Sequence, residues 1–184
     1  LNLGDVRDVL FRVARIMLAF EAATAVVLTG RFWVAYGQDP LTALWNGAFH
    51  AVSAFNNAGF ALFSDNLMGF AQDPWIIVPI CLALIAGGLG FPVFIELWRQ
   101  GFKIRSWSVH TRLTVFGTGA LLVLGTAMFA AFEWNRQETL GGFSQGGKLL
   151  ASLAGGVFPR TAGFNSIDYG AASPETLLVT DILM

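Results

Sequence analysis

Two short stretches of this sequence contain the residue types that could coordinate a cation through the protein backbone. Residues 53–60 read Ser-Ala-Phe-Asn-Asn-Ala-Gly-Phe, and residues 160–165 read Arg-Thr-Ala-Gly-Phe-Asn. A cation that leaves water needs its hydration shell replaced by oxygen atoms, and stacked backbone carbonyls can replace it. Glycine permits the unusual dihedrals that such stacking requires, and it adds no side chain to crowd the ion. The two stretches are therefore candidates for the walls of an ion selectivity filter.

The predicted filter takes four residues from each stretch, and three carbonyl oxygens in each would hold a potassium-type ion. The filter residues are Asn56, Asn57, Ala58 and Gly59, followed by Arg160, Thr161, Ala162 and Gly163. The expected ligands are the backbone carbonyls of Asn57, Ala58, Gly59, Thr161, Ala162 and Gly163. The residues expected to support the filter are Phe60, Phe164 and Asn165.

The polar side chains of these stretches need separate roles. Asn56 and Asn57 are expected to hydrogen-bond the filter backbone. The guanidinium of Arg160 would repel a cation on the pore axis, so we expect it to point away and to brace the loop against a carboxylate or carbonyl groups. Either glycine alone could be an ordinary loop glycine. The recurrence of Ala-Gly-Phe after two short apolar runs favours the filter.

Two short helices must carry these stretches into the bilayer. Residues 41–55 would form a helix about 22 Å long, whereas the hydrocarbon core is about 30 Å thick. Asp39 can cap that helix, with Pro40 in its first turn. Residues 149–158 form a second apolar run that is again too short to cross. Each short helix would point its partly negative C-terminal end at the pore centre, and the chain would then return as a re-entrant loop.

Longer apolar runs predict membrane-spanning helices over residues 16–36, 75–95 and 113–132. The second run contains Gly-Gly-Leu-Gly-Phe-Pro at 87–92. Its glycines would let another backbone approach closely, and Pro92 favours a kink. A further helix is expected to open near Pro174.

Charged residues suggest how the chain crosses the membrane. Basic residues crowd the connection over 99–111, which predicts that it is cytoplasmic. Glu21, inside the first long run, would lie at the interface or pair with a neighbouring helix, and a role in an ion pathway is the alternative. Several carboxylates expected outside could enrich cations near a pore mouth, or could be ordinary loop residues. They are Asp65, Asp73, Glu133, Glu138 and Asp168.

Composition places the chain among integral membrane proteins. Of its 184 residues, 55% are hydrophobic and 12% are charged, whereas a soluble domain carries about 25% charged residues. The formal net charge of −1 gives no reason to expect nucleic-acid binding. The one cysteine, Cys81, cannot form an intrachain disulfide and is expected to be a buried apolar residue.

Several motifs resemble the Trk/Ktr/HKT superfamily of potassium transporters. Residues 49–60 resemble its second pore loop, 87–92 the motif in the following helix, and 160–168 its third pore loop. The resemblance covers nearly the whole chain. It implies an all-α integral membrane protein built from repeated helix–re-entrant pore loop–helix units, four of them around one pore.

The resemblance also implies a division of the chain and a function for the whole protein. Residues 1–98 would be the second unit, 99–111 a cytoplasmic connection, and 112–184 most of the third unit. The chain would then be a fragment that lacks the gate, which is expected after Met184, and does not conduct alone. The full protein would be a multi-pass plasma-membrane (inner-membrane) protein that takes up potassium, with sodium dependence left open and no cofactor. It would form a homodimer and bind a cytosolic nucleotide-binding regulatory subunit.

Two other classes of function stay open at this point. A structural or assembly subunit would not conduct ions. An intramembrane enzyme would need convergent acid–base or metal-binding groups, and the candidates Glu21, His50 and Arg160 lie in different segments.

Overall fold

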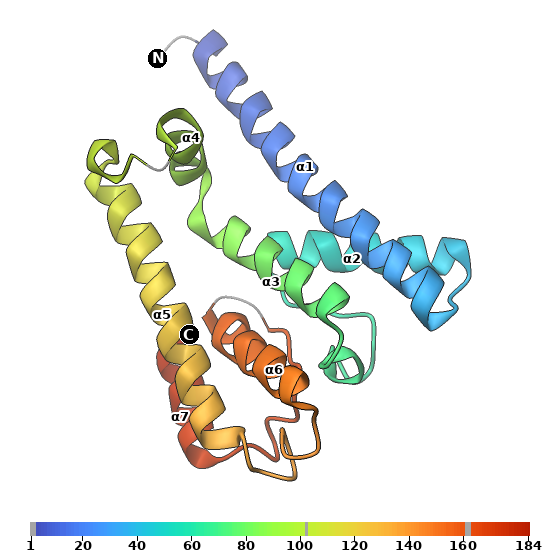
Figure 1. The fold of residues 1–184 in the computed structure, drawn as a ribbon. Coiled ribbons are helices and arrows are strands. Elements are labelled where there is room, and N and C mark those ends of the chain that lie inside the picture. Colours follow the sequence, from blue (N-terminus) through green and yellow to red (C-terminus); the bar gives the residue numbers. More distant parts are fainter. Residues whose placement is uncertain (1–2, 102, 161–162) are drawn as a thin grey trace.

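The computed structural model describes residues 3–101, 103–160 and 163–184, and regular structure over these residues is entirely helical (Figure 1). The α-helices are α1 (Leu3–Tyr36), α2 (Pro40–Phe55), α3 (Pro74–Leu89), α4 (Phe91–Gln100), α5 (Val109–Glu133), α6 (Gln145–Val157) and α7 (Pro174–Leu183). Three short 3₁₀ helices are η1 (Met68–Phe70), η2 (Ile104–Ser106) and η3 (Phe158–Arg160). The predicted all-α class is confirmed.

The helices form two groups with the same order of elements. In the first group α1, α2 and α3 pack on one another, and in the second α5 packs on α6 and α7. The two groups meet where α3 contacts α6, near the middle of the molecule (Figure 1). In each group a long helix is followed by a short helix, an irregular loop and a further helix.

In the part of the chain that the structure describes, two helices are long and apolar enough to cross a membrane, over Arg7–Tyr36 and Val109–Glu133. The apolar helix predicted over 75–95 is present but broken, near the kink that Pro92 favours. There α3 ends at Leu89, and α4 leaves it at an angle of 96°. The break is at Gly90, whose φ of +81° suits glycine, whereas Pro92 takes a place in the first turn of α4 where its missing N–H costs no hydrogen bond.

The short helices begin at capping residues. Asp39 accepts hydrogen bonds from the backbone N–H groups of Leu41 and Thr42 (both 3.1 Å), which confirms the predicted start of α2. In contrast, α6 begins at Gln145, earlier than the apolar run predicted, because Ser144 accepts a bond from Gly147 N (3.1 Å). Lys148 fits in the helix since its Nζ donates to the carbonyl of Trp134 (2.8 Å).

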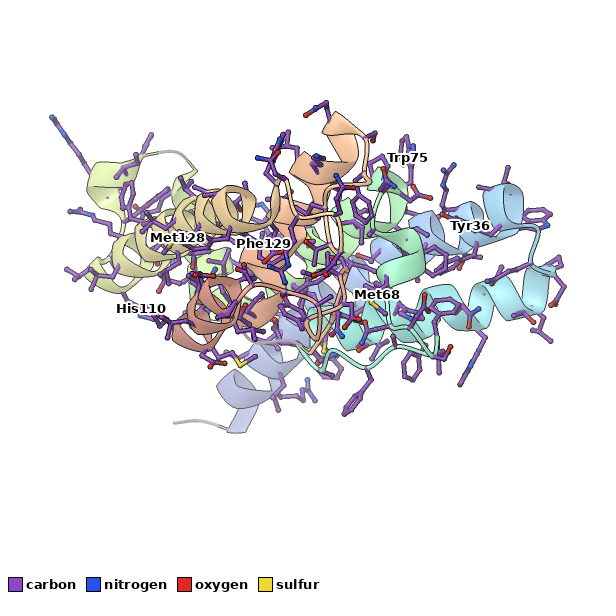
Figure 2. The ribbon with its side chains drawn as sticks, turned by 90° about the horizontal axis from the view of Figure 1, so that it is seen from below. Tyr36, Met68, Trp75, His110, Met128 and Phe129 are labelled. Atoms are coloured by element: carbon purple, nitrogen blue, oxygen red, sulfur yellow. The ribbon has the colours of Figure 1, made fainter. Side chains whose placement is uncertain are left out.

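A buried carboxylate in each group ties the end of the long helix to the start of the third helix. In the first group, Asp73 caps α3 and accepts bonds from Arg31 Nε (2.7 Å) and from the hydroxyl of Tyr36 (2.9 Å). Tyr36, the last residue of α1, is labelled in Figure 2. In the second, Glu133 at the end of α5 accepts bonds from Ser173 N (2.8 Å) and from the Thr176 hydroxyl (2.6 Å) of α7. The two carboxylates thus have structural partners, which their expected place in solvent did not indicate.

We expect Asp73→Ala to lower the free energy of unfolding by about 3 kcal/mol, because it removes a helix cap and the acceptor of two bonds, one from a charged donor. Unfolding of the purified full-length protein in mixed micelles measures this change. Asp65→Ala is the matched control, since Asp65 is exposed and its side chain accepts a bond from Gly69 N. Equal effects of the two substitutions would contradict the proposed tie.

Candidate functional site

The first candidate loop leaves α2 at Phe55 and is closed by Ser53. The carbonyl of Ser53 accepts a bond from Ala58 N, and its hydroxyl donates to the carbonyl of Phe60, both at 2.8 Å. Between these contacts the backbone takes positive φ at Asn57 (+53°) and at Gly59 (+71°). Such angles are costly for most side chains but not for glycine. The loop is therefore a fixed turn at the end of the half-helix.

The second candidate loop follows α6 and η3. Arg160 ends η3, the predicted ligands Thr161 and Ala162 lie outside the described residues, and Gly163 continues the chain. Phe164 is 2% exposed and packs on the Phe158 ring, with centroids 5.8 Å apart. The loop is thus anchored on its C-terminal side by a buried aromatic residue.

The two loops meet, although they are distant in sequence. A Cβ added at Gly163 would lie 3.8 Å from the carbonyl oxygen of Gly59. Asn66, in the return segment of the first group, binds the second loop on both sides of Phe164. Its Nδ2 donates to Gly163 O (3.4 Å) and its Oδ1 accepts from Asn165 N (3.1 Å). No motif in the sequence indicates a role for Asn66. Its place after the first loop is the one signal that could have suggested this contact.

Helix α3 approaches the first loop at a glycine. A Cβ at Gly87 would collide with the carbonyl oxygen of Phe55, the last residue of α2. It would also lie 3.0 Å from the side-chain nitrogen of Asn57. This is the close backbone approach predicted for the glycines of 87–92, whereas Gly90 in the same motif serves the break between α3 and α4.

Glu21 of α1 reaches the first loop. Asn56 Nδ2 donates to Glu21 Oε1 (2.8 Å) and to the carbonyl of Val52 (2.9 Å). Glu21 is only 9% exposed. The sequence left its partner open, and the structure places that partner inside the predicted filter.

Arg160 extends toward α5, where its Nη2 donates to the Thr118 hydroxyl (3.4 Å). Arg160, Leu84 and Gly88 are among the residues that line a small cavity of about 40 Å³. Because desolvation by burial disfavours its charge, the guanidinium needs such polar neighbours. The expected partner was a carboxylate or carbonyl, and the hydroxyl of Thr118 is a partner that the sequence did not suggest.

The two aromatic support residues differ in their surroundings. Phe164 is buried, and the ring of His50 lies between Phe164 and Phe63, with centroids 6.5 Å and 5.1 Å away. His50 is also fixed by a 2.7 Å contact between Nδ1 and the carbonyl of Asn46. In contrast, Phe60 is 71% exposed and borders an apolar groove on α2, next to Trp45. His50 thus packs as a core residue beneath both loops.

Over the described residues, no group of three or more His, Cys, Asp or Glu side chains is arranged to hold a metal ion. Several polar contacts around the two loops go from side chains to backbone groups, as with Ser53 to Phe60 and Asn66 to Gly163. What this arrangement offers a ligand is backbone oxygen at two adjacent bends.

Comparison with known proteins gives a family match over almost the whole chain. The family model described as TrkH, cation transport protein, matches residues 2–184. The chain is 36% identical to the Ktr system potassium uptake protein B of Vibrio alginolyticus, over 98% of this chain and 39% of that protein. It is 38% identical to the protein of the same name from Bacillus subtilis, over 91% of this chain and 37% of that protein.

A third relative is named for the uptake of sodium as well as potassium. The chain is 31% identical to the potassium/sodium uptake protein NtpJ of Enterococcus hirae, over 100% of this chain and 41% of that protein. The chain thus spans about two fifths of the length of these curated relatives.

The contact between the return segment and the second loop predicts a disulfide. With Cys81 replaced by alanine, we expect Asn66→Cys together with Asn165→Cys to cross-link on mild oxidation, because Asn66 Oδ1 lies 3.1 Å from Asn165 N. A protease site placed within 99–111 of the full-length protein reveals the bond, because the two halves then stay joined until reduced.

Asp65→Cys with Asn165→Cys is the matched control. The side chain of Asp65 binds Gly69 N instead of the second loop, so its cross-link should form more slowly. Equal rates for the two pairs, or no cross-link at position 66, would contradict the described contact.

Proposed function

Since the chain belongs to the TrkH family of cation transport proteins, we propose that its two loops are two walls of a potassium selectivity filter in a longer transporter. One observation carries the proposal. Gly163 lies next to the carbonyl oxygen of Gly59, although the two residues come from separate helix–loop–helix groups. We propose that backbone oxygens from both groups face a common space there, which is what replacement of a hydration shell requires.

The proposed ligands are backbone carbonyls, as in the expectation from the sequence. They come from Asn57, Ala58 and Gly59 in the first loop and from Thr161, Ala162 and Gly163 in the second. The positive φ of Gly59 supports this assignment, because such a turn directs carbonyls in ways that a helix does not allow. Asn56 and Arg160 complete the proposed filter segments, and Phe60, Phe164 and Asn165 remain the proposed support.

The half-helices supply a favourable field for a cation. Both α2 and α6 run toward the loops, so their C-terminal ends point at the proposed site. The C-terminal end of a helix carries about half a negative charge, which stabilises a cation nearby without a carboxylate. A neutral filter of this kind binds the ion weakly enough to release it, as conduction requires.

The proposal extends to the whole protein. We propose potassium uptake across the plasma (inner) membrane by a multi-pass protein, of which residues 1–98 and 112–184 would be two of four units. Sodium dependence, a homodimer and a cytosolic nucleotide-binding regulatory subunit belong to the same proposal. Support comes from the relatives, two of which are potassium uptake proteins of a Ktr system.

We expect Gly59→Asp or Gly163→Asp to reduce rubidium uptake to background in cells that lack other potassium transport. Each change adds a side chain and a charge where the two loops meet. Gly37→Asp and Gly142→Asp are matched controls, because a Cβ at either glycine meets no atom within 4 Å and Gly37 also has positive φ (+64°). Normal uptake in both filter variants, with normal membrane insertion, would exclude the proposed pore.

We expect Glu21→Leu to lower the preference for potassium over sodium roughly tenfold, because it removes the acceptor that fixes Asn56. Glu21→Gln keeps a carbonyl oxygen at that point and should retain most of the preference. Competition of sodium with rubidium uptake in proteoliposomes measures the effect. If the leucine and glutamine variants discriminate equally well, Glu21 does not position the filter.

A further inference from the structure

Three arginines from two helices surround an apolar pocket at the end of the molecule where α1 begins and α4 lies (Figure 1). The pocket has a volume of about 320 Å³ and is lined by Arg12, Arg15, Ile16, Ile95, Trp98 and Arg99. On each helix these residues are spaced i, i+3 and i+4, so they share one face. The pocket is therefore formed by two matching faces, each with an isoleucine and at least one arginine.

The arginines of this pocket form no ion pair in the part of the chain that the structure describes. The two ion pairs found there involve Arg31 and Arg136. The acidic residue of α4, Glu96, bonds instead to the start of α5, where it accepts from Ser108 N (2.5 Å) and the Ser108 hydroxyl (2.6 Å). Arg12, Arg15 and Arg99 are exposed, so their positive charges are available to a ligand.

The surroundings of the pocket suit the boundary of a bilayer. The 96° bend after α3 turns α4 away from the direction of the apolar helix before it. Trp98 is 83% exposed, and tryptophan is enriched where hydrocarbon meets headgroups. Arginine side chains at such a depth place their stems on apolar surface and their guanidinium groups in the polar layer.

We propose that this pocket binds an anionic phospholipid. Its acyl chain would lie on Ile16, Ile95 and Trp98, and its phosphate would accept hydrogen bonds from the three guanidinium groups. One guanidinium group can donate two parallel hydrogen bonds to two oxygens of a phosphate, whereas an ammonium group acts as a point charge. A free phosphate ion would leave the apolar floor of the pocket uncovered, so a lipid satisfies both halves of the site. The site is separate from the two loops and does not depend on their proposed function.

Quenching of Trp98 fluorescence tests the proposal on the full-length protein. It is placed in nanodiscs of phosphatidylcholine that contain either brominated phosphatidylglycerol or brominated phosphatidylcholine. The contribution of Trp98 is the signal lost in Trp98→Phe. We expect stronger quenching by the brominated phosphatidylglycerol, and a fall in this preference of about fivefold for each of Arg12→Gln, Arg15→Gln and Arg99→Gln.

Lys103→Gln and Arg105→Gln are the matched controls, because both residues are cationic, lie in the connection after α4 and do not line the pocket. They should leave the preference unchanged, and inorganic phosphate should not compete. An equal loss in the control variants would show only diffuse attraction to an anionic surface and would overturn the site. The site would also be overturned if Trp98 showed no lipid preference in the unaltered protein. That result is the one expected if other protein segments fill the pocket.

Discussion

Backbone groups that leave a helix inside a bilayer have no water to bond, so other protein groups must bond them. The contacts around the two loops meet this requirement with short polar side chains. Ser53 bonds the carbonyl of Phe60, and Asn66 bonds the backbone of Gly163 and Asn165. These bonds come from neutral side chains and satisfy backbone groups that have left a helix. The loops can therefore be irregular without a charged residue in contact with the proposed ion. The glycines fit beside one another because the shape of the loops is already fixed by their neighbours.

The two helix–loop–helix groups reach similar arrangements with different residues. A carboxylate joins the long helix to the third helix in both groups. In the first group this carboxylate is Asp73, which caps the third helix α3, and in the second it is Glu133, the last residue of the long helix α5. The short helix approaches the long helix at a glycine in both. Gly47 of α2 faces α1, and Gly156 of α6 faces Gly125 of α5. Equivalent contacts in the two groups are thus made by different residues at different positions. This is consistent with the weak sequence similarity of the two halves outside Ala-Gly-Phe.

Local signals predicted the start of α2, but the apolar run placed the start of α6 later than its cap at Ser144, and tertiary contacts explain the partners that the sequence did not indicate. Asp39 and Pro40 mark the start of α2, since capping depends on neighbouring residues alone. The break after α3 was expected at Pro92 but lies at Gly90, because proline is accommodated in a first turn and the preceding glycine takes the bend. The role of Asn66 depends on partners from the other group, and that of Thr118 depends on Arg160, which lies 42 residues away within the same group; no local pattern indicates such partners.

The position of Asn66 has a consequence for how such proteins diversify. This residue belongs to the first group, yet it holds the backbone of the second loop at Gly163 and Asn165. The two helix–loop–helix groups of this chain are therefore not independent of each other. A chimera that swaps one unit from a relative would join a return segment to a loop with which it did not evolve, and residue 66 would have to travel with the neighbour it serves.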